Sequence, residues 1–199
     1  MKKKINILCY LFLLPISFPT YSQEGWFWQN PLPQGNHLTD VYFIDSTFGT
    51  AVGYLGTIIN TTDGGENWSV QRSGTTSHLM GVSFSDIYNG IAVGYDGTIV
   101  RTTDGGQYWF GQTGGTNQNL NAVYFTDTNN GTAVGENATI IRTTDGGMTW
   151  TQQSCPTSQH LNGVFFTEVK DGIKPFIVLL EILFKEFDIF ANKSVGEAG

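Results

Sequence analysis

The chain has 199 residues, a formal net charge of -7 and 25 glycines. This length can bury one core of ordinary domain size, and the frequent Val, Ile, Thr and aromatic residues favour strands over helices. The acidic balance argues against contacts with phosphate backbones, so we expect no nucleic-acid partner.

Residues 1–22 have the pattern of a secretory signal peptide. Lys2–Lys4 form a basic start, residues 5–18 are apolar, and Thr20–Ser22 offer small side chains before a cut ahead of Gln23. The apolar run is short and interrupted by proline, which makes a membrane anchor the less favoured interpretation. We therefore expect an exported protein (secreted, periplasmic or at the cell surface) with no membrane insertion after cleavage.

A unit of 41 residues repeats along the rest of the chain. Each copy has an apolar first strand and an acidic residue with a glycine four positions later, and the first three copies continue with a second and a third short strand and a turn-rich segment. Four short strands per repeat are typical of one β-propeller blade. We predict an all-β fold with about three four-stranded blades between residues 23 and 172. The units begin near Leu38, Leu79, Leu120 and Leu161.

The segment that ends each of the first three units reads Thr-x-Asp-x-Gly-x-x-Trp. It resembles the Asp-box, or BNR repeat, of sialidases and related propellers. Three copies at constant spacing make the resemblance specific. The matching residues are Thr61, Asp63, Gly65, Trp68, Thr102, Asp104, Gly106, Trp109, Thr143, Asp145, Gly147 and Trp150.

The fuller pattern is Ala-Val-Gly, then Gly-Thr-Ile, then Arg-Thr-Thr-Asp-Gly-Gly-x-x-Trp. It is most similar to the photosystem II stability/assembly factor-like propellers, over roughly residues 26–172. The resemblance implies a propeller; it does not imply a photosynthetic role.

We expect the Asp-boxes to be structural. A carboxylate in a tight turn can accept backbone N–H groups that the hairpin leaves unpaired, glycine adopts the left-handed conformation, and tryptophan packs on neighbouring strands. One aspartate per blade is too sparse for a calcium site, so we expect no metal ion and no cofactor.

Arg101 and Arg142 occupy the same position in two consecutive units, where the first unit has Asn60. Two arginines on adjacent blades could form a cationic patch on an otherwise acidic protein. In the assembly-factor-like family such arginines are associated with partner binding, so the resemblance implies that role here. Solvated residues at a strand end are the alternative.

Tyr42, Tyr54, Tyr95 and Tyr124 also recur at blade positions. Aromatic residues in alternating strands favour packing between blades. A platform that stacks on sugar rings is the alternative.

Both ends of the chain depart from the repeat. Gly25–Trp28 resembles an isolated outer strand, and the fourth unit loses the pattern after Gly172. Residues 173–199 are rich in Ile, Leu and Phe with interspersed charges, and residues 177–190 could form an amphipathic helix. We interpret this tail as non-native sequence, for example from a frameshift, and the chain as part of a larger propeller, because a closed ring needs roughly four to eight blades.

These features predict a non-catalytic exported module that binds an unknown protein or carbohydrate. The alternative is a fragment of an Asp-box glycoside hydrolase, sialidase-like or glucan-cleaving. Asp40, Asp96 and Glu136 break the repeat, but none has a partner carboxylate in the pattern that a glycosidase needs. We therefore assign no catalytic residue.

Overall fold

The computed structural model describes residues 34–169 and 172–178, with side-chain surroundings as far as Phe166. The expected signal peptide, the expected strand at Gly25–Trp28 and residues 179–199 of the tail lie outside the described residues.

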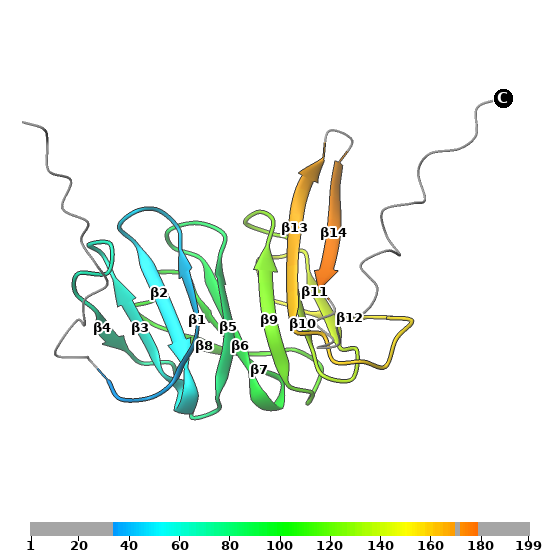
Figure 1. Cartoon of the computed structure of the whole chain (residues 1–199), viewed down its shortest axis with the longest axis horizontal. Helices are drawn as coiled ribbons and strands as arrows, with labels where there is room; N and C mark the ends of the chain where they lie inside the picture. The colour runs from blue at the N-terminus through cyan, green and yellow to red at the C-terminus, as the bar shows by residue number, and fades with distance from the viewer. Residues whose placement is uncertain (1–33, 170–171, 179–199) are drawn as a thin grey trace, which may run out of the picture. The chain divides into compact units, whose positions relative to one another are not determined.

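Three four-stranded antiparallel sheets follow one another along the described chain, and each keeps its strands in sequence order (Figure 1). Blade 1 contains β1 (Leu38–Phe43), β2 (Gly49–Gly53), β3 (Ile58–Thr61) and β4 (Ser69–Gln71). Blade 2 contains β5 (Leu79–Phe84), β6 (Gly90–Gly94), β7 (Thr98–Thr102) and β8 (Phe110–Thr113). Blade 3 contains β9 (Leu120–Phe125), β10 (Gly131–Gly135), β11 (Ile140–Thr143) and β12 (Thr151–Gln153). The predicted all-β fold with three four-stranded blades is confirmed.

An acidic turn closes the first hairpin of each blade. Asp86 Oδ1 accepts the backbone N–H groups of Tyr88 at 2.8 Å and Asn89 at 2.9 Å. Asp45 and Asp127 make the corresponding bonds in blades 1 and 3. These bonds satisfy N–H groups that the two strands leave unpaired at the turn.

The second hairpin turns through two consecutive residues of positive φ, within the short 3-10 elements η1 (Tyr54–Gly56) and η2 (Tyr95–Gly97) of blades 1 and 2. Gly97 has a φ of 68° there, whereas blade 3 places Ala138 at the corresponding position with a φ of 56°. An alanine therefore holds a conformation that residues with a Cβ atom adopt at some cost.

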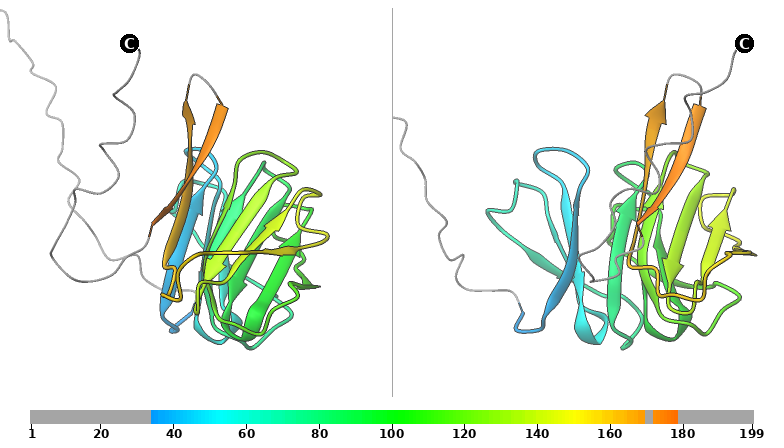
Figure 2. Two further views of the ribbon diagram at one scale, coloured as in Figure 1. Left: turned by 90° about the vertical axis from the view of Figure 1, so that its right-hand side faces the viewer. Right: turned by 45° about the vertical axis from the view of Figure 1, so that its right-hand side comes forward.

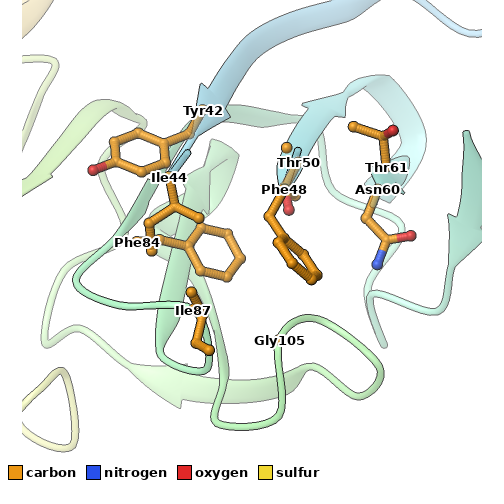
Figure 3. Close-up of a pocket in the computed structure, with 10 residues that line it drawn as sticks. Tyr42, Ile44, Phe48, Thr50, Asn60, Thr61, Phe84, Ile87 and Gly105 are labelled. Carbon is orange, nitrogen blue, oxygen red and sulfur yellow. The ribbon is translucent and has the colours of Figure 1, made fainter. Parts of the chain in front are cut away.

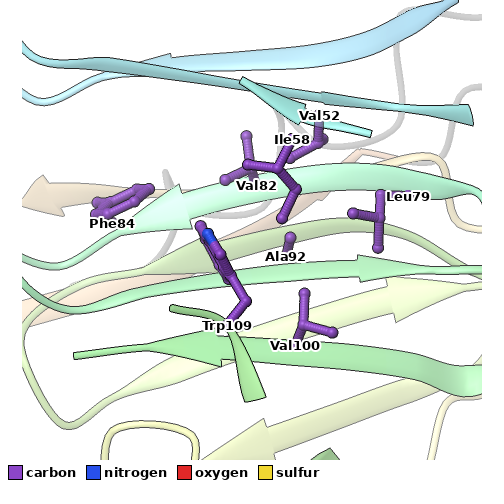
Figure 4. Packing of buried hydrophobic residues seen from close by; sticks show 8 residues of the cluster. All are labelled: Val52, Ile58, Leu79, Val82, Phe84, Ala92, Val100 and Trp109. Atoms are coloured by element: carbon purple, nitrogen blue, oxygen red, sulfur yellow. The ribbon is translucent and has the colours of Figure 1, made fainter. Parts of the chain in front are cut away.

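A phenylalanine, a glycine and the Asp-box tryptophan form the outer core of each blade. In blade 2 the ring of Phe84 meets Trp109 edge-on, with centroids 5.9 Å apart (Figure 4). A Cβ atom on Gly90, which pairs with Phe84 across the strands, would lie 2.7 Å from that ring. Glycine is therefore required for the close approach. The same edge-on contact recurs in blades 1 and 3.

The first strands of successive blades lie next to one another, β1 beside β5 and β5 beside β9. Leu79 and Leu120, which open β5 and β9, are fully buried, whereas Leu38 of β1 is 46% exposed. Asp40 accepts the backbone N–H of Val82 in the next blade at 2.8 Å. Burial is the main cause that raises the pKa of Asp40 above its ordinary value. Its carboxylate thus joins two blades.

Three of the four repeated tyrosines contact a ring beyond their own blade. Tyr42 lies 6.2 Å from Phe84 and Tyr124 lies 5.8 Å from Phe166, between ring centroids. Tyr54 stacks on His78 at 4.3 Å. Packing between blades, the interpretation that the sequence favours, accounts for these three side chains.

The fourth unit begins with a hairpin of β13 (Gly163–Val169) and β14 (Gly172–Val178), drawn in orange in Figures 1 and 2. Residues 173–178, which the repeat pattern assigns to a tail outside the blades, form a strand that pairs with β13. A helix is expected over residues 177–190, but Ile177 and Val178 belong to strand β14. The rest of this range lies outside the described residues.

The pairing register of this hairpin differs from that of the complete blades. Phe125 pairs with Gly131 in blade 3, but Phe166 pairs with Pro175 and Gly172 pairs with Val169. The two strands consequently pair over seven residues each. Proline has no N–H to donate, so it suits β14, which has no strand on its other side among the described residues.

Candidate binding site

The Asp-box turns are held by hydrogen bonds within each turn. Thr61 Oγ1 donates to Asp63 Oδ1 at 2.7 Å and accepts the N–H of Gly65 at 2.9 Å. Asp63 Oδ1 also accepts the N–H of Asn67 at 2.9 Å. Blades 2 and 3 repeat these bonds from Thr102 and Asp104, and from Thr143 and Asp145. All three threonines are buried.

These bonds favour the charged carboxylate. The side-chain hydroxyl and then the backbone N–H of Thr149 hold the pKa of Asp145 at about 2. The N–H and then the side-chain amide of Asn67 hold the pKa of Asp63 at about 2 as well. Both carboxylates are engaged by groups of their own turn.

The Asp-box tryptophans differ in their polar contacts. Trp109 Nε1 donates to the Gly106 carbonyl at 3.1 Å, whereas Trp150 Nε1 is buried and has no hydrogen-bond partner among the described residues. Each ring still packs against the phenylalanine of its own blade.

The two arginines that the sequence groups together lie in different surroundings. Arg101 is partly buried, and its Nε donates to the carbonyl of Gly146 in the Asp-box of blade 3 at 2.8 Å. Arg142 is exposed and makes no hydrogen bond or ion pair with a described residue. Arg101 therefore joins two blades, and Arg142 faces solvent.

Arg142 lines a hollow of about 400 Å³ between blade 3 and β13. The lining is mixed, with the polar side chains of Asp127, Asn130 and Gln153 on blade 3 and the ring of Phe166 on β13. The corresponding hollow between blades 1 and 2 has a volume of about 20 Å³ (Figure 3). The repeat pattern gives Arg101 and Arg142 the same position in their units and therefore does not reveal this hollow.

The remaining acidic candidates are scattered. Asp40 lies on β1, Asp96 lies in η2, and Glu136 follows β10. Among the described residues no group of three or more His, Cys, Asp or Glu side chains could hold a metal ion. Within the same part of the chain, no helix has the length and hydrophobicity needed to cross a bilayer.

The model of the family described as photosynthesis system II assembly factor YCF48 matches residues 19–109 and 112–178. The chain belongs to the YCF48 family. The match includes the β13–β14 hairpin and extends past Gly172. The family resemblance inferred from the Asp-box repeats is thereby confirmed.

Two solved YCF48 structures resemble the chain. YCF48 bound to D1 peptide is 25% identical with a TM-score of 0.58, over 65% of this chain and 43% of that one. YCF48 from Cyanidioschyzon merolae is 22% identical with a TM-score of 0.55, over 74% of this chain and 58% of that one. The chain thus spans about half the length of these YCF48 proteins.

An ancestral GH74 enzyme shares the fold at 18% identity and a TM-score of 0.50, over 61% of this chain and 19% of the enzyme. That likeness shows the fold alone. No curated protein matches the chain.

Proposed function

We propose that this YCF48-family chain is an exported, non-catalytic module that binds a segment of a partner protein at the Arg142 hollow. The observation that carries the proposal is the contrast between Arg101, whose guanidinium bonds to a backbone carbonyl, and Arg142, whose guanidinium has no such acceptor among the described residues. The family supports a protein partner, since one YCF48 structure contains a bound D1 peptide. Export rests on the signal-peptide pattern of residues 1–22.

The contact at Arg101 indicates what Arg142 would bind. Gly146 offers a carbonyl oxygen from a turn that approaches the arginine across the blade junction. A partner segment that enters the 400 Å³ hollow would present a carbonyl or carboxylate to Arg142 in the same way. Guanidinium groups bind such oxygens strongly because the hydrogen bonds are charge-assisted. Phe166 supplies an apolar wall for a side chain of the segment.

The glycoside hydrolase alternative has less support. A glycosidase needs two carboxylates flanking the scissile bond. The Asp-box carboxylates accept bonds within their own turns, and Asp40 bonds to the next blade. An assay of the full chain on aryl glycosides and sialosides separates the classes, and turnover abolished by one acidic substitution would contradict the binding role.

Peptide binding tests the proposal directly. Peptides selected from a random phage library on the full chain, together with the D1 peptide, would be measured by fluorescence polarisation. We expect Arg142→Ala to weaken binding by about tenfold, because it removes one charge-assisted hydrogen bond. Arg72→Ala is the matched control, since Arg72 is also exposed but lies outside the hollow. Equal loss in both variants, or no selected binder, would contradict the proposal.

A further inference from the structure

Four exposed apolar residues on blades 1 and 2 stand where the sister blades carry polar residues. Phe48 corresponds to Asn89 and Asn130, and Ile87 corresponds to Ser46 and Thr128. Tyr88 and Tyr108 are 59% and 64% exposed. The polar residues that correspond to these two tyrosines are Thr47, Asn129, Asn67 and Thr149. Because the other copies of the blade fold with polar residues there, the fold does not require these apolar side chains.

These four residues, which we call the edge patch, lie at one end of the sheets. Phe48 is in the β1–β2 turn, Ile87 and Tyr88 are in the β5–β6 turn, and Tyr108 is in the Asp-box of blade 2. Phe48 and Ile87 line the small hollow between the two blades, together with Gly105 (Figure 3). The N–H of Gly105 donates to the Tyr88 carbonyl at 3.0 Å, which fixes the Asp-box turn against the β5–β6 turn.

Carboxylates are built into the same turns. Asp45 accepts the N–H of Phe48 at 2.8 Å, and Asp86 accepts that of Tyr88 at 2.8 Å. Asp104 accepts the N–H of Tyr108 at 3.0 Å. Residues 34–169 contain eleven acidic residues against three arginines and no lysine. The arginine at this end of blade 2, Arg101, is bonded to Gly146 on the side of blade 3. The edge patch therefore combines exposed aromatic surface with negative charge.

We propose that the edge patch is a second interaction surface, which binds a cationic segment of a partner protein that carries apolar side chains. Large exposed aromatic residues are typical anchors of protein interfaces, and the carboxylates of the three turns attract Lys and Arg. The hollow of about 20 Å³ between Phe48 and Ile87 admits a group of about the size of a methyl and is too small for a sugar ring. The surface is separate from the Arg142 hollow, so it stands independently of the proposed function.

The repeat supplies substitutions that the fold already tolerates. The variant Phe48→Asn, Ile87→Thr, Tyr88→Asn and Tyr108→Thr gives every position of the edge patch its blade-3 residue. Phe110→Thr is the matched control. Phe110 is 56% exposed and corresponds to Thr151, but it lies outside the edge patch, because it pairs on β8 with Arg101, which bonds to blade 3. The single variant Tyr108→Thr, on an exposed side chain, keeps the test valid if the fourfold variant fails to fold.

Three labelled peptides serve as probes in fluorescence polarisation on the full chain. One combines Lys with Leu and Phe, the second replaces Lys by Glu, and the third replaces Leu and Phe by Ser. We expect the first to bind best, to bind the fourfold variant at least about tenfold more weakly, and to lose affinity as salt rises. We expect Tyr108→Thr to weaken it measurably, with Phe110→Thr and Arg142→Ala unchanged.

Several outcomes would overturn the proposal. They are equal binding of the first peptide by the wild type and both edge-patch variants, a preference for the Glu peptide that persists in Arg142→Ala, or no binding of any peptide. Binding of a soluble β-glucan oligosaccharide that the edge-patch variants abolish, in place of peptide binding, would assign the patch to carbohydrate instead. Because Arg142→Ala tests the other surface, failure here leaves the proposed function standing.

Discussion

The junction between blades 2 and 3 and the junction between blade 3 and the β13–β14 hairpin use the same repeat positions, but only the first is closed. Arg101 reaches the carbonyl of Gly146, and a Cβ atom on Gly147 would lie 2.6 Å from Ile91 of blade 2. Arg142, one repeat later, faces a hollow. The difference teaches that the role of a repeat residue depends on what the next blade offers.

The largest predicted effect concerns Gly97 in the β6–β7 turn, at the end of the sheet opposite the Asp-box turn. A Cβ atom on Gly97 would lie 2.0 Å from the backbone oxygen of Thr116 in the segment that links blades 2 and 3. Gly97→Ala therefore forces the backbone to move, and we expect a loss of roughly 3 kcal/mol in the free energy of unfolding. Chemical denaturation monitored by tryptophan fluorescence measures it.

Ala138→Gly is the reciprocal change at the junction of blade 3 with β13. Ala138 occupies the position of Gly97 without the clash, and its N–H donates to the Gln159 carbonyl at 2.8 Å. We expect the free energy of unfolding to rise by up to about 1 kcal/mol, because glycine adopts the positive φ without strain. The greater freedom of glycine in the unfolded chain reduces this gain. A large loss in Ala138→Gly, or none in Gly97→Ala, would contradict the comparison.

A smaller effect is predicted for the arginines themselves. Arg101→Ala removes a charge-assisted bond between blades, and we expect a loss of about 1–2 kcal/mol in the free energy of unfolding. Arg142→Ala removes an exposed side chain without a described partner, and we expect a change within about 0.5 kcal/mol. Equal destabilisation by the two substitutions would show that Arg142 is also bonded within the fold.

The smallest predicted effect is the pH dependence of the Asp-box. Asp145 has a pKa of about 2, below its ordinary value, because Thr149 bonds its charged form. Its stabilisation is present above the ordinary pKa and is lost as pH falls towards 2. We expect Asp145→Asn to be less stable than the wild type at pH 7 and to approach it near pH 2, in thermal unfolding followed by circular dichroism. A difference independent of pH would exclude the charge as its cause.

Much of the fold could be predicted from the sequence because the repeat is local. The leucines and glycines that recur every 41 residues mark the strands and turns of all three blades, and the turn bonds of the Asp-box follow from residue type and spacing. The β13–β14 hairpin could not be predicted, because a pairing of Phe166 with Pro175 departs from the register of every other blade.

The different roles of the two arginines also could not be predicted from the sequence. The acceptor of Arg101 lies 45 positions further on, in another blade, and the spacing within one unit carries no information about it. The edge patch, by contrast, could have been found from the sequence. Phe48, Ile87, Tyr88 and Tyr108 depart from their sister residues in a plain alignment of the three units.

Each four-stranded sheet consists of strands that are consecutive in the sequence, and this affects the order in which the chain folds. Since β5 to β8 pair only with their sequence neighbours, each blade can form its ladder before the adjacent blade does, and low contact order favours rapid formation. Folding can then start in any blade and spread along the chain, as in other repeat proteins. Blade 2, which is packed on both sides, should retain its amide protons longest in hydrogen exchange, and blade 1, with Leu38 and Val41 exposed, should release them sooner.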